Sequence, residues 1–445
     1  MTTTAFRGDF LHCLRDPGLD GDVAAIEFVR DGMLLVRDGR IETLQPAASV
    51  ASQLGPDVPV NDYRGHLIVP GFIDTHVHYP QVDVIASHGT QLLHWLERYT
   101  FPEERKFADA AYARATAEFF LDQLIANGTT TAAVYCTVHP QSVDAFFEAA
   151  APRRLRMIAG KALMDRNCPE YLRDTAETGY RDSKALIERW HGKDRLAYAI
   201  TPRFAPTSTP EQLARTGQLA REHPDVYIQS HVAENPGEVA WARELFPEAR
   251  SYLDVYERAG LLRDRAIYGH CIWLDDTDRA RMAATGAAAA FCPTSNLFLG
   301  SGLYDLKRAD ELGVRTGLAT DVGGGTSYSM LATMGAAYQV QQLQGVSLSP
   351  AKALYLATLG AAKSLCLEDR IGNFAQGKEA DFVVLDRQAT PLLTRRMSLG
   401  RDAQDSLFAF MLLGDERAVA ATFVLGEPVQ VTRARGEGRG ALSPQ

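Results

Sequence analysis

The chain has 445 residues, 46% of them hydrophobic and 23% charged, and a formal net charge of −9 at pH 7. This composition predicts a globular protein with a large core, and the lack of a long basic run excludes an extended nucleic-acid interface. The sequence has neither the roughly 18 apolar residues of a membrane span nor an apolar signal segment at its start. Its six cysteines form no C-x-x-C pair, so we expect a cytoplasmic protein in a reducing compartment.

The first segment, to about residue 65, contains short apolar runs separated by turn-forming pairs. Runs at 24–29, 33–36 and 40–44 are separated by Asp31-Gly32 and Asp38-Gly39. Asp-Gly between apolar runs is a strong hairpin signal. We therefore expect short strands with a turn at each of the two pairs.

In the middle segment, 68–370, short apolar runs alternate with amphipathic helical patterns. One helix is expected at 109–127, before Gly128, and another has Thr209 as its N-cap and Pro210 in its first turn. Eight strands alternating with helices predict a (β/α)8 barrel of the TIM type. The candidate strands are 72–76, 130–135, 156–163, 196–201, 226–231, 266–270, 287–292 and 314–321.

The last segment returns to strands, at 382–385 and 419–425. Strand-rich ends around an α/β middle suggest that both termini build one small β-sandwich domain. The predicted division is 1–67 and 371–445 for this β domain and 68–370 for the catalytic barrel. The basic stretch from Arg433 to Arg439 is interpreted as a solvated tail.

Two histidines, His76 and His78, lie two positions apart near the end of the first barrel strand. Side chains two apart on a strand point to the same side, so both imidazoles can face the barrel interior. Such a pair alone is equally compatible with two polar residues at a strand end.

Recurrence gives the pattern its weight, because His231, His270 and Asp321 also end apolar runs that lead into polar or Gly-rich loops. In α/β barrels this is the face that carries the active site. Imidazoles and a carboxylate gathered there suit zinc, and also iron or manganese. An open position on such an ion takes a water and lowers its pKa. The alternative is that each residue is separately hydrogen-bonded.

Glu234 lies three residues after His231. A carboxylate just past a metal ligand can take a proton from water and deliver it to a ring nitrogen or a leaving group. The alternative is an acidic residue at a helix N-terminus, stabilised by the helix dipole. We favour the catalytic role because of the neighbouring histidine.

Longer stretches around these residues resemble the amidohydrolase superfamily and, within it, the guanine deaminase family. The segment 70–78, PGFIDTHVH, is similar to the metal-binding opening of the superfamily. Further stretches that carry the resemblance are YPQ at 79–81, WLERYTFP at 95–102, TPRFAPT at 201–207, QSHVAEN at 229–235, FCPTSN at 291–296, TDVGGGTS at 320–327 and KEADFV at 378–383.

This resemblance implies a zinc-dependent barrel enzyme, a homodimer, that hydrolyses guanine to xanthine and ammonia in purine catabolism. One zinc ion per chain would be held by the family's ligands, with a further histidine that binds the ion or polarises its water. The ligands implied are His76, His78, His231 and Asp321, and the further histidine is His270. Glu234 would be the proton shuttle, and both it and His231 would contact the substrate.

The resemblance also assigns three substrate-binding residues. A guanidinium such as Arg203 suits the O6 and N7 acceptors of guanine, the amide of Gln81 donates and accepts at once, and the ring of Phe204 can stack on a purine. The alternatives are an ion-paired arginine, a capping glutamine and a core phenylalanine.

Several features limit the choice of chemistry. Two-metal relatives use a carboxylated lysine on the fourth strand, whereas here that strand ends at Arg203, which stays protonated, and Lys161 lies one strand earlier. This favours one ion. Cytidine-type deaminases need a P-C-x-x-C motif that is missing here. The glycines 323–325 fit no phosphate loop and are expected to permit a tight turn.

Two other functions remain open. A related barrel enzyme could act on another purine, a pterin or a triazine. A structural relative without catalysis would have lost its ligands, and the intact set of histidines and acids argues against it.

Overall fold

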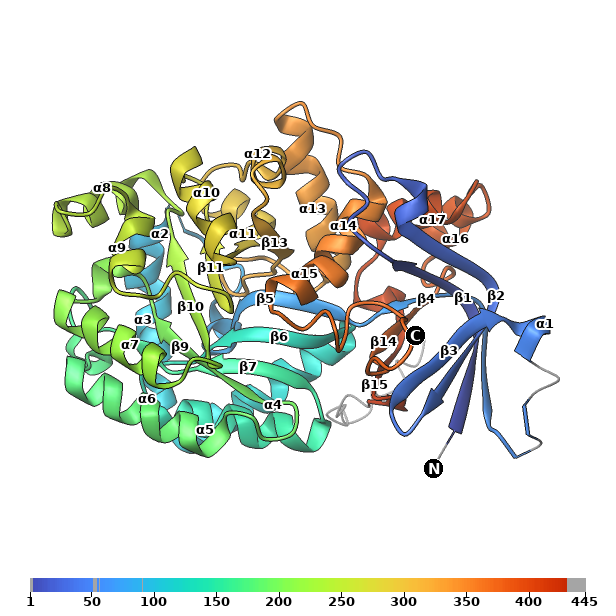
Figure 1. Ribbon diagram of the computed structural model, residues 1–445, viewed down its shortest axis with the longest axis horizontal. Helices are drawn as coiled ribbons and strands as arrows, with labels where there is room; N and C mark the ends of the chain where they lie inside the picture. The colour runs from blue at the N-terminus through green and yellow to red at the C-terminus, as the bar shows by residue number, and fades with distance from the viewer. Residues whose placement is uncertain (1–2, 51–53, 56, 90, 430–445) are drawn as a thin grey trace, which may run out of the picture.

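The computed structural model describes residues 3–50, 54–55, 57–89 and 91–429. It has two parts, a barrel surrounded by helices and a separate sheet beside it (Figure 1). The stretch predicted as a solvated tail, 433–439, lies outside the described residues. Among the described helices, none is long and apolar enough to cross a bilayer.

The predicted barrel is confirmed. Its parallel strands neighbour one another in chain order, and the short β8 (Ala162–Leu163) adds a pairing to β9. The first and last strands meet where the backbone N–H of Asp321 donates to the carbonyl of His76 (3.0 Å) and that of His78 donates to Val322 (2.8 Å). The eight strands are β5 (Phe72–His78), β6 (Thr129–Tyr135), β7 (Arg156–Gly160), β9 (Ala197–Pro202), β10 (Tyr227–Val232), β11 (Ala266–His270), β12 (Ala288–Phe291) and β13 (Arg315–Leu318).

Helices cover the outside of the barrel (Figure 1). The expected N-cap is confirmed, since Thr209 Oγ1 accepts the backbone N–H of Gln212 at 3.1 Å. The expected end at Gly128 is also confirmed, because this glycine has a φ of 79° directly after the helix. The main helices are α4 (Ala110–Ala126), α5 (Pro140–Ala150), α6 (Ala176–Trp190), α7 (Pro210–Glu222), α8 (Pro236–Leu245), α9 (Tyr252–Arg258), α10 (Asp276–Thr285), α13 (Met330–Leu343) and α14 (Pro350–Ala357).

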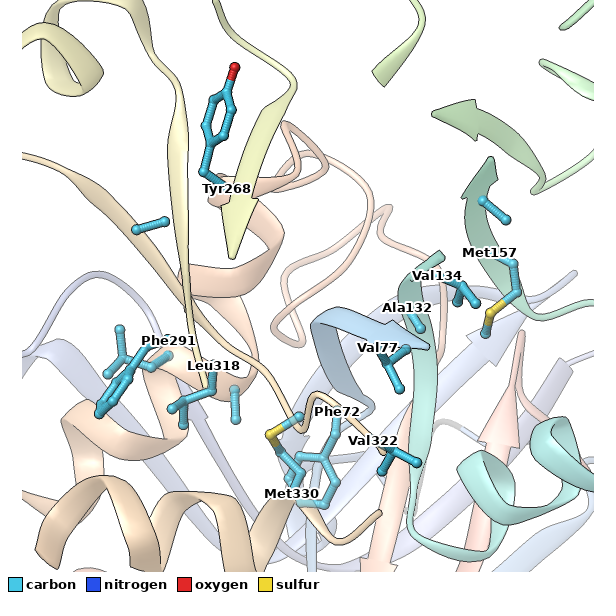
Figure 2. Close-up of a cluster of buried hydrophobic side chains, with 14 of the residues drawn as sticks. Phe72, Val77, Ala132, Val134, Met157, Tyr268, Phe291, Leu318, Val322 and Met330 are labelled. Carbon is cyan, nitrogen blue, oxygen red and sulfur yellow. The ribbon is translucent and has the colours of Figure 1, made fainter. Parts of the chain in front are cut away.

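The barrel strands bury alternate residues on two sides. On β6, Ala132 and Val134 pack in the layer between strands and helices, whereas Ala133 belongs to a second cluster with Ile158 and Ile267. This alternation is the period of two that a strand imposes. Figure 2 shows members of the outer layer, which fill the space between the strands and their covering helices.

Both ends of the chain contribute to a seven-stranded sheet, as expected, with the order β16-β15-β14-β4-β1-β2-β3. The strand β4 pairs with β1 from the N-terminal segment and with β14 from the C-terminal segment. The domain boundaries given above remain predictions. The strands are β1 (Thr3–Cys13), β2 (Ile26–Arg37), β3 (Arg40–Pro46), β4 (Val60–Pro70), β14 (Phe382–Leu385), β15 (Val419–Val424) and β16 (Glu427–Pro428).

One of the two expected hairpin turns is wrong. The pair Asp38-Gly39 does connect β2 to β3, with φ of 48° and 79°. At Asp31-Gly32, however, β2 continues without a turn. Asp31 has a φ of 46°, and its carboxylate accepts two hydrogen bonds from the guanidinium of Arg7, on the neighbouring strand β1 (2.7 and 2.8 Å). Cross-strand pairing and a local irregularity therefore replace the predicted turn.

The C-terminal segment also contains helices that the sequence did not predict. They are α16 (Pro391–Met397) and α17 (Ala403–Leu413), and they lie between β14 and β15. The apolar residues of α17, including Leu407 and Phe410, are buried. Residues 407–413 of α17 form a continuous apolar run without a helical period, and α16 has only seven residues, so neither gives a clear periodic signal.

Candidate active site

Five polar side chains gather at the carboxyl ends of the barrel strands, as the sequence predicts. His76 and His78 lie on β5, His231 on β10 and His270 at the end of β11, and Asp321 follows β13. The side chains of His76, His78, His270 and Asp321 are almost fully buried, and His231 is partly buried. Residues far apart in the chain thus meet because parallel strands end on one face of the barrel.

The ring nitrogens of three histidines face one another. The Nε2 atom of His78 lies 3.2 Å from Nε2 of His76 and 3.2 Å from Nε2 of His231. Asp321 Oδ1 lies 3.3 Å from Nε2 of both His76 and His78. The donor atoms of His76, His78 and His231 all lie within 4.8 Å of one another, and so do those of His76, His270, Cys292 and Asp321. The two groups share His76, and such separations leave room for an ion among the donors.

The tautomers of two histidines suit metal binding. Nδ1 of His231 lies 2.6 Å from the carbonyl oxygen of Arg203, to which it can only donate, so Nε2 keeps its lone pair. Nδ1 of His270 lies 2.9 Å from Oδ1 of Asn296, which fixes that ring in the same way. Each lone pair is therefore directed into the cluster.

The charge states suit a cation as well. Burial lowers the pKa of His78 to about 3 and that of His231 well below its usual value, so these rings stay neutral. Burial opposes ionisation of Asp321, but hydrogen bonds from His76 and His78 outweigh it and hold the pKa of this carboxyl well below its usual range. Neutral imidazoles and an ionised carboxylate are the forms that bind zinc.

The backbone at the cluster is unusual. His270 and Asp321 have φ of 71° and 51°, a region that residues other than glycine rarely adopt. Gly269 leaves room for the first histidine, because a Cβ there would lie 2.6 Å from Cε1 of His76. Gly325 permits the expected tight turn after Asp321, because a Cβ would lie 1.7 Å from the carbonyl oxygen of Thr320. Strain of this kind concentrates at functional sites.

Cys292 is a member of the cluster that the sequence analysis did not assign. Its Sγ lies within 4.8 Å of donor atoms of His76, His270 and Asp321. Burial raises its pKa well above the usual value, and its thiol donates to the carbonyl of Ala290 at 3.4 Å. Its position just after β12 was the available signal. A neutral thiol is a poorer ligand than the imidazoles around it.

Glu234 faces the cluster from the loop after β10. Its Oε2 lies 3.4 Å from Nε2 of His270, and its Oε1 accepts a hydrogen bond from Ser301 Oγ at 2.9 Å. Burial, together with the nearby charge of Asp321, raises its pKa to about 8. A carboxyl group that titrates near neutral pH is suited to accept and return a proton.

A second buried carboxyl group, that of Glu238, supports this loop. Its Oε2 accepts the backbone N–H of Glu234 (3.0 Å) and that of Asn235 (3.3 Å), and Tyr252 donates to Oε1 at 2.6 Å. Burial raises its pKa to about 7, with a contribution from the charge of Glu234. Glu238 was not predicted from the sequence, although Asn235 and Glu238 have the spacing of a capping box.

A cavity beside the cluster is lined by both apolar and polar residues. Leu92, Trp95, Leu96 and Leu299 supply apolar surface, and Phe204 adds an aromatic ring. The polar residues on its wall are His78, Gln81, Arg203, His231, Glu234, Glu238, His270 and Asp321. An apolar cavity with a few converging polar groups is the usual form of a small-molecule site.

All five residues expected to contact the substrate line this cavity: Gln81, Arg203, Phe204, His231 and Glu234. Arg203 and Gln81 share a partner that the sequence analysis missed, the buried carboxylate of Glu104. Arg203 Nη1 donates to both of its oxygens, at 2.8 and 2.7 Å, and Gln81 Nε2 lies 3.5 Å from Oε1. The ion-paired arginine considered as an alternative is thus present, and it also faces the cavity.

Lys161 is not part of the cavity wall. Its buried ammonium pairs with Asp174, and its backbone N–H donates to Tyr198 Oη at 3.2 Å. This position agrees with a structural role for the lysine.

Known proteins resemble the chain over nearly its full length. A guanine deaminase of Escherichia coli (strain K12) is 51% identical over 429 residues, which cover 96% of this chain and 98% of that protein. The structure of an E. coli guanine deaminase superposes with a TM-score of 0.94 at 50% identity, covering 96% of this chain and 99% of that one. The crystal structure of a guanine deaminase from C. acetobutylicum with bound guanine gives a TM-score of 0.87 at 28% identity, covering 96% and 100%.

A family model agrees with these likenesses. The model of the amidohydrolase family matches residues 67–429, a range that contains the whole barrel and every residue of the cluster. The sequence resemblance, the barrel and the cluster of histidines at its carboxyl end all lead to the same family. The chain belongs to the amidohydrolase family.

Proposed function

We propose that the protein hydrolyses guanine to xanthine and ammonia. The observation that carries this proposal is the cavity, which Gln81, Arg203 and Phe204 line together with histidines of the cluster and Glu234. The extensive likeness to guanine deaminases supports it. The cluster and Glu234 provide polar partners for a water molecule, and Gln81 and Arg203 provide them for a flat purine.

We infer that the cluster holds one zinc ion. His76, His78, His231 and Asp321 are the proposed ligands, and the donor geometry described above supports them. When bound, the ion lowers the pKa of water and makes it a stronger nucleophile at neutral pH. His270 lies 3.8 Å from Asp321 Oδ2 and 3.4 Å from Glu234, a place from which it either completes the ligand set or polarises the water.

The wall of the cavity orients the purine. Arg203 donates to the edge that carries O6 and N7, and Gln81 offers both a donor and an acceptor to the same base. Phe204 presents a ring on which the base stacks, an interaction of roughly 1–3 kcal/mol. This orientation directs the C2 amino group toward Glu234, and His231 contacts the substrate from the floor of the cavity.

Glu234 then transfers two protons. It accepts a proton from the attacking water and delivers it to N3 of guanine while the new C2–O bond forms. His270 and Asp321 hold the attacking oxygen in place. In the second transfer a proton passes from that oxygen to the amine, the C2–N bond breaks, and ammonia and xanthine leave.

A related activity on another purine, a pterin or a triazine is the nearest alternative. The buried arginine and glutamine favour a base with an oxo group over one without. A structural relative without catalysis is disfavoured, because the donor set is intact. We further propose a cytoplasmic homodimer, and sedimentation of the purified protein checks the second part.

The test is ammonia release from guanine, compared with adenine, cytosine and 8-oxoguanine, with metal content determined on the same sample. We expect rapid release from guanine and about one zinc ion per chain. If the metal is present and guanine is inert, the roles given to Gln81, Arg203 and Phe204 are wrong. If no metal is bound, the ligand assignment fails.

A further inference from the structure

Glu104, the last residue of α3 (Phe101–Glu104), contacts two residues that line the cavity, Gln81 and Arg203. Its side chain is 1% exposed, and it accepts both hydrogen bonds from Nη1 of Arg203. It is not itself among the residues that line the cavity, whereas Arg203 and Gln81 are. Its carboxylate thus contacts two cavity residues without lining the cavity itself.

The pairing controls which donors of Arg203 reach the cavity. A guanidinium has five N–H groups, and Glu104 takes those on Nη1. Within the described part of the chain, no acceptor takes the groups on Nε and Nη2. The guanidinium also lies over the ring of Phe101, with 5.5 Å from Cζ to the ring centroid. The arginine is therefore held on two sides, and its remaining N–H groups are free for a ligand.

The same carboxylate fixes the orientation of the Gln81 amide. Nε2 donates toward Glu104 Oε1 at 3.5 Å, and Oε1 accepts the backbone N–H of Gly323 at 3.3 Å. Rotating the amide by half a turn would place its oxygen against a carboxylate and its NH2 against an N–H. One N–H and one lone pair of the amide consequently remain for the substrate, in a defined order.

We propose that Glu104 is a positioning residue that sets specificity for a purine with a 6-oxo group. It presents Arg203 as a donor and Gln81 as a donor next to an acceptor, which matches a carbonyl beside a ring N–H. A base with hydrogen or an amino group in place of the oxo group keeps only N7 as an acceptor on that edge. One donor is then left unpaired, which is costly in a buried site. This inference rests on the proposed function.

The test compares Glu104→Gln with the wild-type holoenzyme and with Glu103→Gln. Glu103 is the matched control, since it is the adjacent buried glutamate and contacts Lys106 (2.6 Å) and Tyr112 instead of the cavity wall. Two ligands are used: xanthine, which keeps the 6-oxo group, and 2-aminopurine, which lacks it. Their Kd values come from the fluorescence of 2-aminopurine and its displacement by xanthine, and guanine turnover is measured in parallel.

For Glu104→Gln we expect the Kd of xanthine to rise about a hundredfold and that of 2-aminopurine to rise at most threefold. For guanine, we expect KM to rise by a larger factor than the one by which kcat falls. Glu104→Asp, which keeps the charge, should recover part of the selectivity. Equal weakening of both ligands, or no change in either, overturns the inference. Wild-type protein that binds both ligands and releases no ammonia from guanine refutes the proposed function alone, because the binding comparison does not depend on turnover.

If Glu104→Gln does not fold, Glu104→Asp carries the test. A shortened side chain retracts the carboxylate from Arg203, so the same loss of selectivity for xanthine is expected at smaller size, about tenfold. Unchanged selectivity in a folded Glu104→Asp protein overturns the inference.

Discussion

The carboxylate of Glu238 accepts the backbone N–H of Glu234, with 3.0 Å between Oε2 and the nitrogen. The residue proposed as proton shuttle is therefore held through its main chain by a second acid, and its side chain stays free to reach the cluster. Tyr252 anchors this second acid from the opposite side at 2.6 Å. In this arrangement Glu238 positions the loop, and Glu234 is left to transfer the proton.

Replacing Glu234 by Gln should abolish proton transfer without disturbing the metal. The amide keeps the shape of the side chain and the hydrogen bond from Ser301, but it cannot accept a proton at neutral pH. We expect kcat to fall by about 10²–10⁴-fold with unchanged zinc content. Steady-state kinetics and metal analysis on one preparation check this, and near-normal turnover by a zinc-loaded variant would show that another group moves the proton.

Glu238 should make the free energy of unfolding depend on pH. Its pKa is about 7 in the folded chain against a usual 4.5, so the folded state holds a proton that the unfolded state has lost between these values. This contribution to stability is complete below pH 4.5 and disappears as the pH rises through 7.

Glu238→Gln should remove that dependence, on the order of 1–3 kcal/mol between pH 5 and 8. A glutamine also satisfies a capping box, so the helix start is retained. Urea unfolding of metal-free protein across this range measures the effect. Tyr252→Phe is the counterpart control, because losing a hydrogen bond that lowers the pKa should move the transition upward. A wild-type slope in Glu238→Gln would contradict the prediction.

The pair of Arg203 and Glu104 should show a strong coupling in stability. Arg203→Met leaves a buried carboxylate without its partner and should lower the free energy of unfolding by about 3–5 kcal/mol. Adding Glu104→Leu removes the unpaired charge and should restore most of the loss, but not activity on guanine. A double variant no more stable than Arg203→Met would mean that the pair is not an isolated unit.

Gly269→Ala should weaken metal binding. The added Cβ would lie 2.6 Å from Cε1 and 2.9 Å from Nδ1 of His76, so the ring has to move away from the cluster. We expect zinc affinity to fall by about 10–100-fold, the range seen when support of a metal ligand is lost. Gly55→Ala is the control, because its nearest neighbour is Val58 Cγ2 at 3.9 Å. Competition with a chelator measures both, and equal zinc affinities would contradict the prediction.

The sequence by itself determined the barrel and the place of its site. Alternating apolar runs and helical patterns located the eight strands within a few residues, and the helix signals at Thr209 and Gly128 were correct. The five cluster residues were identifiable because each one ends an apolar run. Hydrophobic periodicity and helix-capping residues are local properties of the sequence. They can therefore be recognised without knowing which residues contact one another in the fold.

Only the tertiary structure decided how the polar wall of the cavity is built. Glu104 and Arg203 are 99 positions apart, and nothing in either segment indicates that the two side chains meet. The same holds for Arg7 and Asp31, which pair across β1 and β2 at a position where the sequence is typical of a turn. The closure of the whole barrel decides which loops face one another across its mouth. An ion pair between residues far apart in the chain produces no periodic pattern in the sequence, so it cannot be predicted from local signals.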